Sequence, residues 1–260
     1  MKSRSCWAGP SVAATLGLLE QVKRCSADRK WNTDVYFENR TVEFLLTLRK
    51  LEGLEVLPIS RFLELGCGIG YSLLLWSQVA DQAVGVDLPE VIGRGRELLG
   101  ALDLPAANIS LQGSTAEDVQ AGGRYDVILT QYVLEHVRDI GQTLQNLRAH
   151  LEQGGVAIHV LNGCVDRLGW YAEYRLRCSL PRRLAQSVRD RGLLRTLANP
   201  FNFTPAHEPR FGDYTRELSE YSLERWALRL YMAGFQIVDV FQTRDTNWVF
   251  VTRATEQAQG

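Results

Sequence analysis

The sequence lacks the features that would tie a chain to a membrane, to nucleic acid or to an oxidising compartment. No run approaches the roughly 18 apolar residues of a membrane-spanning helix. The 29 basic and 30 acidic side chains leave a net charge of −1, so there is no overall attraction to nucleic acid or to an anionic membrane. The five cysteines are odd in number and contain no C-x-x-C pair, which argues against a disulfide framework and a zinc cluster. We therefore expect a cytoplasmic protein without a metal site, without stable membrane insertion and without a nucleic-acid partner.

A weakly apolar run near the N-terminus superficially resembles a signal peptide. Lys2 and Arg4 precede it, and it extends over residues 12–19. It is short, it is followed by charged residues, and it has no small-residue cleavage site. Because Ser11 after a proline is typical of a helix cap, the run is predicted to belong to a first helix instead.

The stretch that organises the chain joins a short apolar run to three glycines at alternate positions. Residues 62–70 read Phe-Leu-Glu-Leu-Gly-Cys-Gly-Ile-Gly. The apolar run predicts a buried strand, and Gly66, Gly68 and Gly70 allow the backbone to approach a ligand closely. A helix from Tyr71 would then point its N-terminal amides at that ligand. The pattern predicts a site for a nucleotide-like cofactor.

Two acidic residues decide which cofactor this turn favours. A dinucleotide fold uses G-x-G-x-x-G, whereas the spacing here is G-x-G-x-G, with Tyr71 in the place of the last glycine. Glu64 stands two residues before the first glycine, where it would repel a pyrophosphate and attract a cationic amino-acid group. Asp87 ends the next predicted strand, roughly 20 residues after the first glycine, where a carboxylate can accept both ribose hydroxyls. This pair favours S-adenosylmethionine, whose ammonium and sulfonium are both positive, and leaves a nicotinamide cofactor as the distant alternative.

Three motifs in this order resemble the class I S-adenosylmethionine-dependent methyltransferases, in particular their small-molecule (type 11/23-like) group. They are E-x-G-x-G-x-G at 64–70, V-G-V-D at 84–87 and L-E-H-V-x-D at 134–139. The resemblance covers residues 60–162 strongly and residues 221–253 weakly. It implies an α/β fold with a Rossmann-like, mostly parallel seven-stranded sheet and helices on both faces, with S-adenosylmethionine as cofactor and a small-molecule substrate. One departure is that the family usually has an acid after the third strand to receive the adenine amino group, where residues 113–116 offer only hydroxyls and backbone.

The hydrophobic pattern of the central region alternates between strands and helices, which predicts a parallel sheet. Four segments are expected: N-terminal helices over the cofactor site in 1–57, a cofactor-binding core in 58–162, an inserted helical cap in 163–220, and a final helix with the last two strands in 221–254. The predicted helices are 11–25, 40–52, 71–80, 89–102, 138–152 and 222–233, and the predicted strands are 61–65, 83–87, 108–112, 125–130, 155–161, 236–242 and 247–253. Helical spacing assigns the buried faces of the first two helices to Val12, Leu16, Leu19 and Val22, and to Val42, Leu45, Leu46 and Leu48.

The inserted segment is the most individual part of the sequence. Residues 167–195 contain eight arginines against two acidic side chains, and apolar residues recur every four positions from Leu176 to Val188. This spacing predicts cap helices with one apolar and one basic face. A solvated basic face is the simplest interpretation, and recognition of an acidic or phosphorylated substrate or contact with a membrane surface or RNA are the alternatives. The loop 200–211, rich in proline and aromatic residues, is expected to close over the substrate.

Residues at the strand ends are predicted to line the cofactor site, because ligands of such sheets bind beyond the carboxyl ends of the strands. Tyr36 and Arg40, from the aromatic and polar segment 31–40, are expected at the methionine end. The alternative is that this segment only docks the N-terminal helix on the sheet. The predicted cofactor-binding set is Tyr36, Arg40, Glu64, Gly66, Cys67, Gly68, Gly70, Asp87, Leu88, Ser114, Thr115 and Gln131.

Methyl transfer from a sulfonium is an in-line displacement, so a base is needed only when the acceptor keeps its proton. Histidine is the most suitable base near neutral pH, and there are four. His136 follows the fourth strand, in the loop that faces the methyl group in the resembled family, and ranks first; His207 in the cap loop ranks second. His150, late in a helix, and His159, within an apolar strand, are expected to be structural, and Glu135 is expected to face a helix N-terminus.

These observations predict a methyltransferase that acts on a hydroxyl group of a small molecule. Secondary metabolism is one pathway type in which such an enzyme is expected. Transfer to nitrogen or carbon, which needs no strong base, is the alternative enzyme activity. A non-catalytic, cofactor-binding partner subunit is the alternative from another class. The oligomeric state is left open between monomer and homodimer.

Overall fold

The computed structural model describes residues 10, 12–25, 34–102, 108–119, 122–161, 223–243 and 247–255. The strands are β1 (Ile59–Leu65), β2 (Ala80–Asp87), β3 (Ile109–Gly113), β4 (Tyr125–Gln131), β5 (Leu151–Leu161), β6 (Phe235–Gln242) and β7 (Trp248–Ala254). The helices are α1 (Val12–Cys25), α2 (Asp34–Gly53), α3 (Tyr71–Trp76), α4 (Pro89–Ala101), α5 (Ile140–Ala149) and α9 (Leu223–Met232).

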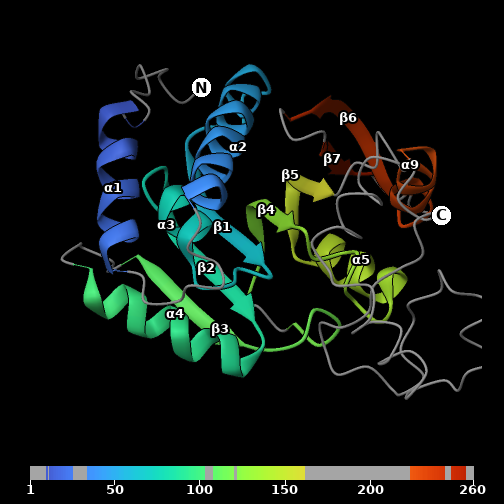
Figure 1. The fold of residues 1–260 in the computed structure, drawn as a ribbon. Helices are drawn as coiled ribbons and strands as arrows, with labels where there is room; N and C mark the ends of the chain where they lie inside the picture. Colours follow the sequence, from blue (N-terminus) through green and yellow to red (C-terminus); the bar gives the residue numbers. More distant parts are fainter. Residues whose placement is uncertain are drawn as a thin grey trace, which may run out of the picture.

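A seven-stranded sheet in the order β3-β2-β1-β4-β5-β7-β6 organises these elements. The first five strands of the chain are parallel, and β7 pairs antiparallel with both β5 and β6. Helices α1 to α4 pack on one face of the sheet and α5 and α9 on the other (Figure 1). The predicted fold class, a mostly parallel Rossmann-like sheet between two layers of helices, is confirmed.

Neighbouring residues of each central strand face opposite cores. Phe62 stacks on Trp76, with ring centroids 4.8 Å apart, on the side of α2 and α3. Leu63 belongs to the opposite core, which also contains Trp226 and Phe235. Because both faces are buried, the central strands consist of continuous apolar runs instead of alternating apolar and polar residues.

Helix α2 is longer than predicted and begins at Asp34 instead of residue 40. The polar residues of its first turns find partners within the helix. Thr41 Oγ1 donates to the carbonyl oxygen of Phe37 at 2.8 Å, and Arg40 pairs with Glu43 at 2.8 Å. The helix therefore includes most of the aromatic and polar segment 31–40.

Two other helices are shorter than predicted. Helix α3 ends at Trp76 instead of residue 80, because Ser77 is its C-cap and β2 already begins at Ala80. Helix α5 ends at Ala149 instead of residue 152, because His150 is its C-cap and β5 begins with the next residue.

The buried faces of α1 and α2 are rotated relative to the prediction. Leu16, Val42 and Leu46 are 48%, 43% and 41% exposed, although Leu19, Val22 and Leu48 are buried as expected. Polar residues occupy the buried positions instead, namely Thr15, Thr41, Glu43 and Thr47. Because these polar residues share the buried faces with apolar residues such as Leu18, Phe44 and Leu51, the spacing of apolar residues alone misplaces those faces.

No helix within the described residues is long and apolar enough to cross a membrane. In the same part of the chain, no group of three or more His, Cys, Asp or Glu side chains is placed to hold a metal ion. The predicted cap at 163–220, with its basic segment and its loop at 200–211, lies outside the described residues.

Candidate cofactor site

The turn between β1 and α3 packs against the loop that follows β4. Gly66, Gly68 and Gly70 have φ angles of 72°, 56° and 84°, the positive values that the spacing predicted. A β-carbon on Gly66 would lie 2.0 Å from Cγ2 of Val133, so no larger residue fits between the two segments. Among the described residues, a β-carbon on Gly68 or Gly70 would meet nothing within 4 Å. The second half of the turn therefore has open space for a ligand.

Gly85, in the V-G-V-D motif, lets strand β2 approach the turn. A β-carbon there would lie 2.7 Å from Cδ2 of Leu73 and 2.8 Å from Sγ of Cys67. Burial raises the pKa of the Cys67 thiol, and the nearby carboxyls of Glu64 and Asp87 raise it further. The Cys67 thiol is therefore protonated and packs inside the turn, and its sulfur is unsuited to act as a nucleophile.

Glu64 is a deeply buried carboxyl at the penultimate position of strand β1. The residue is 2% exposed, and burial raises its pKa from 4.5 to about 8, although a hydrogen bond from Ser72 and the charge of Arg40 act in the opposite direction. Oε2 of Glu64 is buried and has no hydrogen-bond partner among the described residues. An ammonium group would supply a hydrogen-bond donor for Oε2 and a positive charge that stabilises the ionised carboxyl. Glu64 therefore fits the amino-acid end of S-adenosylmethionine.

Asp87 joins the ends of three neighbouring strands. Its Oδ2 accepts a hydrogen bond from the backbone N–H of Gly68, and its Oδ1 accepts one from Leu88, both at 2.7 Å. The N–H of Ser114 donates to the carbonyl oxygen of Asp87 at 2.9 Å. Burial raises the pKa of Asp87, and the two N–H groups on its carboxylate oppose that shift. Each carboxylate oxygen keeps a further lone pair, so the oriented group can accept two ribose hydroxyls.

The loop after β3 contains carboxyls that the sequence analysis did not assign. Oγ1 of Thr115 donates to Oδ2 of Asp118 at 2.7 Å and accepts from the N–H of the same residue at 3.2 Å. Oε1 of Glu117 accepts from the N–H groups of Arg138 and Asp139 at 2.7 and 3.1 Å, which ties the loop to the start of α5. The Thr115 hydroxyl is thus engaged within its own loop. The two acids follow directly after 113–116, the segment in which the expected acid is missing.

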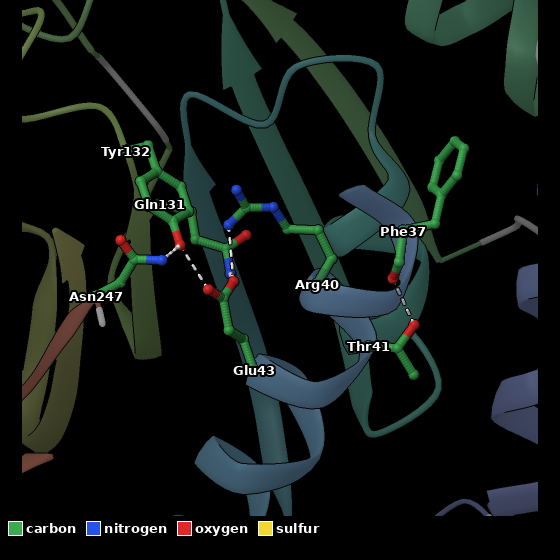
Figure 2. A network of polar contacts seen from close by, with 7 residues as sticks. All are labelled: Phe37, Arg40, Thr41, Glu43, Gln131, Tyr132 and Asn247. Atoms are coloured by element: carbon green, nitrogen blue, oxygen red, sulfur yellow. Dashed lines mark hydrogen bonds and ion pairs between the residues drawn. The ribbon is translucent and has the colours of Figure 1, made fainter. Parts of the chain in front are cut away.

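Arg40 and Gln131, two predicted site residues, meet at Glu43, which the sequence analysis missed (Figure 2). Oε2 of Glu43 accepts from Nη1 of Arg40 at 2.8 Å and from Nε2 of Gln131 at 2.9 Å. One signal for Glu43 was its three-residue spacing from Arg40, which puts both on one helix face. Tyr36 lies in α2, but its side chain is outside the described part.

His136 lies half-buried in the loop after β4, and its backbone N–H donates to the carbonyl oxygen of Val133 at 2.8 Å. Because Val133 covers Gly66, this loop is packed against the glycine turn. Glu135 is fully buried. The side chain that caps α5, where we expected Glu135, is that of Asp139.

The other histidines agree with their predicted structural roles where the structure describes them. His159 is fully buried, with Nδ1 2.9 Å from Oγ1 of Thr130, and burial lowers its pKa to about 3, so it is a neutral core residue. His150 closes α5, with Nδ1 2.8 Å from the carbonyl oxygen of Asn146. His207 lies outside the described residues.

Comparison with curated proteins finds partial relatives. The ubiquinone biosynthesis O-methyltransferase of Nitrobacter winogradskyi is 32% identical over 108 residues, which are 42% of this chain and 41% of that protein. The protein of the same name from Bradyrhizobium sp. is 31% identical over 110 residues, 42% of this chain and 43% of its own length. The chain therefore spans about two fifths of the length of the curated relatives it matches.

Solved structures resemble the whole fold at low sequence identity. A magnesium protoporphyrin IX methyltransferase from Synechocystis PCC 6803 with bound S-adenosylhomocysteine has a TM-score of 0.54 at 14% identity, over 90% of this chain and 91% of that one. An S-adenosylmethionine-dependent methyltransferase from Clostridium acetobutylicum has a TM-score of 0.55 at 14% identity, over 92% and 97%. At these identities the likeness shows the fold alone.

A family model described as a methyltransferase domain matches residues 29–240, which is most of the chain. The match includes the glycine turn, Asp87 and the loop with His136. S-adenosylmethionine, the predicted cofactor, is the methyl donor of the class I group that the three motifs resemble. The resemblance is thereby confirmed, and the chain belongs to the methyltransferase domain family.

Proposed function

We propose that the protein transfers the methyl group of S-adenosylmethionine to a hydroxyl group of a small molecule. The observation that carries the proposal is the pair of carboxyls around the glycine turn. Glu64 has a buried oxygen without a hydrogen-bond partner among the described residues, and Asp87 is oriented by two backbone N–H groups. A positive amino-acid end and a ribose complement these groups, whereas a pyrophosphate would meet a repelling carboxyl.

The residues of the chain bind and align the cofactor. In this proposal Glu64 and Asp87 take the ammonium and the ribose, and the backbone of the turn lies beneath the ligand. The remaining contacts come from Cys67, Leu88, Ser114 and Thr115 toward the adenosine and from Tyr36, Arg40 and Gln131 toward the methionine end. The sulfonium supplies an activated methyl group, so the part left to the protein is to align acceptor and methyl and to exclude water.

His136 is the proposed general base for a hydroxyl acceptor. Its loop follows β4 and is packed on the glycine turn through Val133, so it lies at the strand ends where the methyl group is expected. The names of the partial relatives, which are O-methyltransferases, support oxygen as the acceptor atom. His207 is the second candidate, as the proposed cap at 163–220 would bring it over the substrate.

The decisive experiment incubates the purified protein with a metabolite extract and a methyl donor carrying an isotopic label. We expect a labelled product whose methyl group is bound to oxygen. A label on nitrogen or carbon would overturn the hydroxyl assignment. Cofactor binding without any transfer would favour the non-catalytic partner subunit, and absence of cofactor binding would refute the proposed function as a whole.

A further inference from the structure

We propose that Glu43 is a positioning residue of the methyl-transfer site, because it holds Arg40 on one side of the cofactor and the loop after β4 on the other. The inference rests on the proposed function, since it takes the cofactor to lie over the glycine turn. It concerns a residue of α2 that the sequence did not single out.

The Glu43 carboxylate is the centre of a buried polar network. The residue is 2% exposed, and its two oxygens accept hydrogen bonds from Arg40, Gln131 and Tyr132 at 2.8, 2.9 and 2.5 Å. Figure 2 shows these side chains converging on the carboxylate from α2 and from the end of β4. A buried carboxylate is stable only with such partners, so the network fixes α2 against β4.

The first arm of the network is Arg40. Its guanidinium is bound by Glu43 at Nη1 and lies over the ring of Tyr132, 4.0 Å from the centroid. Its charge also favours the ionised form of Glu64 and so lowers the pKa of that second buried carboxyl. Glu43 balances the charge of Arg40, so that Glu64 remains available to bind the ammonium of the cofactor. Without Glu43, the guanidinium would be balanced by Glu64 and would compete with the ligand.

The second arm of the network is Tyr132. Its hydroxyl donates to Glu43 and accepts from Nδ2 of Asn247, the residue before β7, at 2.6 Å. Its φ of 56° lies in the left-handed region that few bulky residues adopt, so side-chain contacts must hold this conformation. Burial and the charge of Glu43 raise the pKa of the hydroxyl, so it stays a donor.

The conformation of Tyr132 sets the course of the loop that follows it. Val133 is the next residue and covers Gly66, and His136 comes three residues later. Through Tyr132, Glu43 therefore positions the loop that contains the predicted base. A displacement of this carboxylate would change the distance between the two halves of the site.

The test of the first arm is a double-mutant cycle on the binding of S-adenosylhomocysteine, measured by calorimetry. Arg40→Gln should weaken binding about 10- to 100-fold, as expected for one charge-assisted hydrogen bond. Glu43→Gln should weaken it about 10-fold in the native background but less than about two-fold in the Arg40→Gln background, because its effect passes through Arg40. The matched control is Glu52→Gln, an exposed carboxyl of the same helix, which should leave binding unchanged.

An equal loss from Glu43→Gln in both backgrounds, or no loss in the native one, would overturn the proposal. A different failure is recognised separately: if neither Arg40→Gln nor Asp87→Ala weakened binding, the proposed cofactor site itself would be wrong. Thermal unfolding of each variant checks that it is folded. Should Glu43→Gln not fold, Glu43→Asp enters the same cycle; it keeps the charge but moves it away from Arg40 by one methylene, so a smaller loss is expected, again confined to the background with Arg40.

The second arm is tested by hydrogen exchange in Tyr132→Phe, which loses one donor to Glu43. We expect amide exchange in residues 133–137 to become about 10-fold faster, because one hydrogen bond that holds the loop is lost. Amides of β3 serve as the internal control and should keep their rates. Unchanged exchange in 133–137 would show that Glu43 does not position this loop.

Discussion

Val133 lies directly over Gly66, so that a β-carbon on the glycine would come within 2.0 Å of Cγ2 of the valine. The contact joins the turn of the proposed cofactor site to the loop that contains His136. Because the glycine turn and the loop after β4 pack against each other here, a change in the size of either residue should shift the other segment.

Gly66→Ala should destabilise the protein by roughly 1–3 kcal/mol and weaken cofactor binding, because the new methyl group meets Val133 and the φ of 72° is strained for alanine. Urea unfolding and calorimetry measure the two effects. Gly93→Ala in α4, where a β-carbon would meet nothing within 4 Å in the described part of the chain, is the control and should be neutral or stabilising by up to about 1 kcal/mol. Adding Val133→Ala to the Gly66 variant should recover part of the loss, and no recovery would contradict the steric explanation.

The stability of the cofactor-free protein should fall with rising pH because of Glu64. In the unfolded chain this carboxyl loses its proton near pH 4.5, whereas in the folded protein it keeps the proton up to about pH 8. Between these values the folded state binds more protons than the unfolded state, so the free energy of unfolding decreases as the pH rises. Urea unfolding across this range measures the slope, which Glu64→Gln should flatten. Equal slopes in the two proteins would refute a protonated Glu64.

Asp87→Ala should weaken S-adenosylmethionine and S-adenosylhomocysteine alike, by about one to two decades in dissociation constant. The physical reason is the loss of a charge-assisted, bidentate contact with the ribose, together with the acceptor that orients Gly68 and Leu88. Calorimetry is the measurement. Asp81→Ala, an exposed acid on the same strand, is the control and should bind normally. Unchanged affinity in the Asp87 variant would remove it from the site.

His136→Ala should lower turnover about 10²- to 10⁴-fold with little change in cofactor affinity, as expected for a general base. The loss should shrink for an acidic phenol, which ionises without help. His150→Ala is the matched control, because His150 is the C-cap of α5 and is not part of the loop that contains His136. The same measurement on His207→Ala ranks the two candidates. Full turnover in both variants would point to transfer to nitrogen or carbon.

Replacing residues 163–220 by a short linker should leave a folded protein that binds the cofactor, because the proposed cofactor contacts all lie outside that segment. Circular dichroism and calorimetry measure folding and binding. Substrate turnover is expected to be lost. A folded variant that no longer bound the cofactor would show that the segment belongs to the cofactor site as well.

Local spacing was sufficient to predict the glycine turn, the place of Asp87 and the core role of His159. In each case the relevant residues are close in sequence, and the conformation follows from glycine, from strand burial or from the strand end. The parallel sheet was predictable for the same reason, since it follows from alternating strands and helices.

The Glu43 network was not predictable from spacing because its partners are distant in the chain. Gln131 lies 88 positions away from Glu43, and its amide is one of the reasons why a carboxyl can be buried in α2. The apolar pattern instead assigned Val42 and Leu46 to the buried face. A tertiary hydrogen bond thus overrides the periodicity of the helix.

The position of β7 between β5 and β6 has a consequence for synthesis of the chain. The edge of β5 from Ala157 to Leu161 is paired only when Thr252 to Trp248 lie beside it. A nascent chain that has reached Leu161 therefore presents an open, apolar strand edge, of the kind that associates with other chains. At ordinary rates of translation, the wait until Trp248 emerges lasts on the order of ten seconds. Protection of β5 by a chaperone during that interval would reduce losses to aggregation before the sheet is complete.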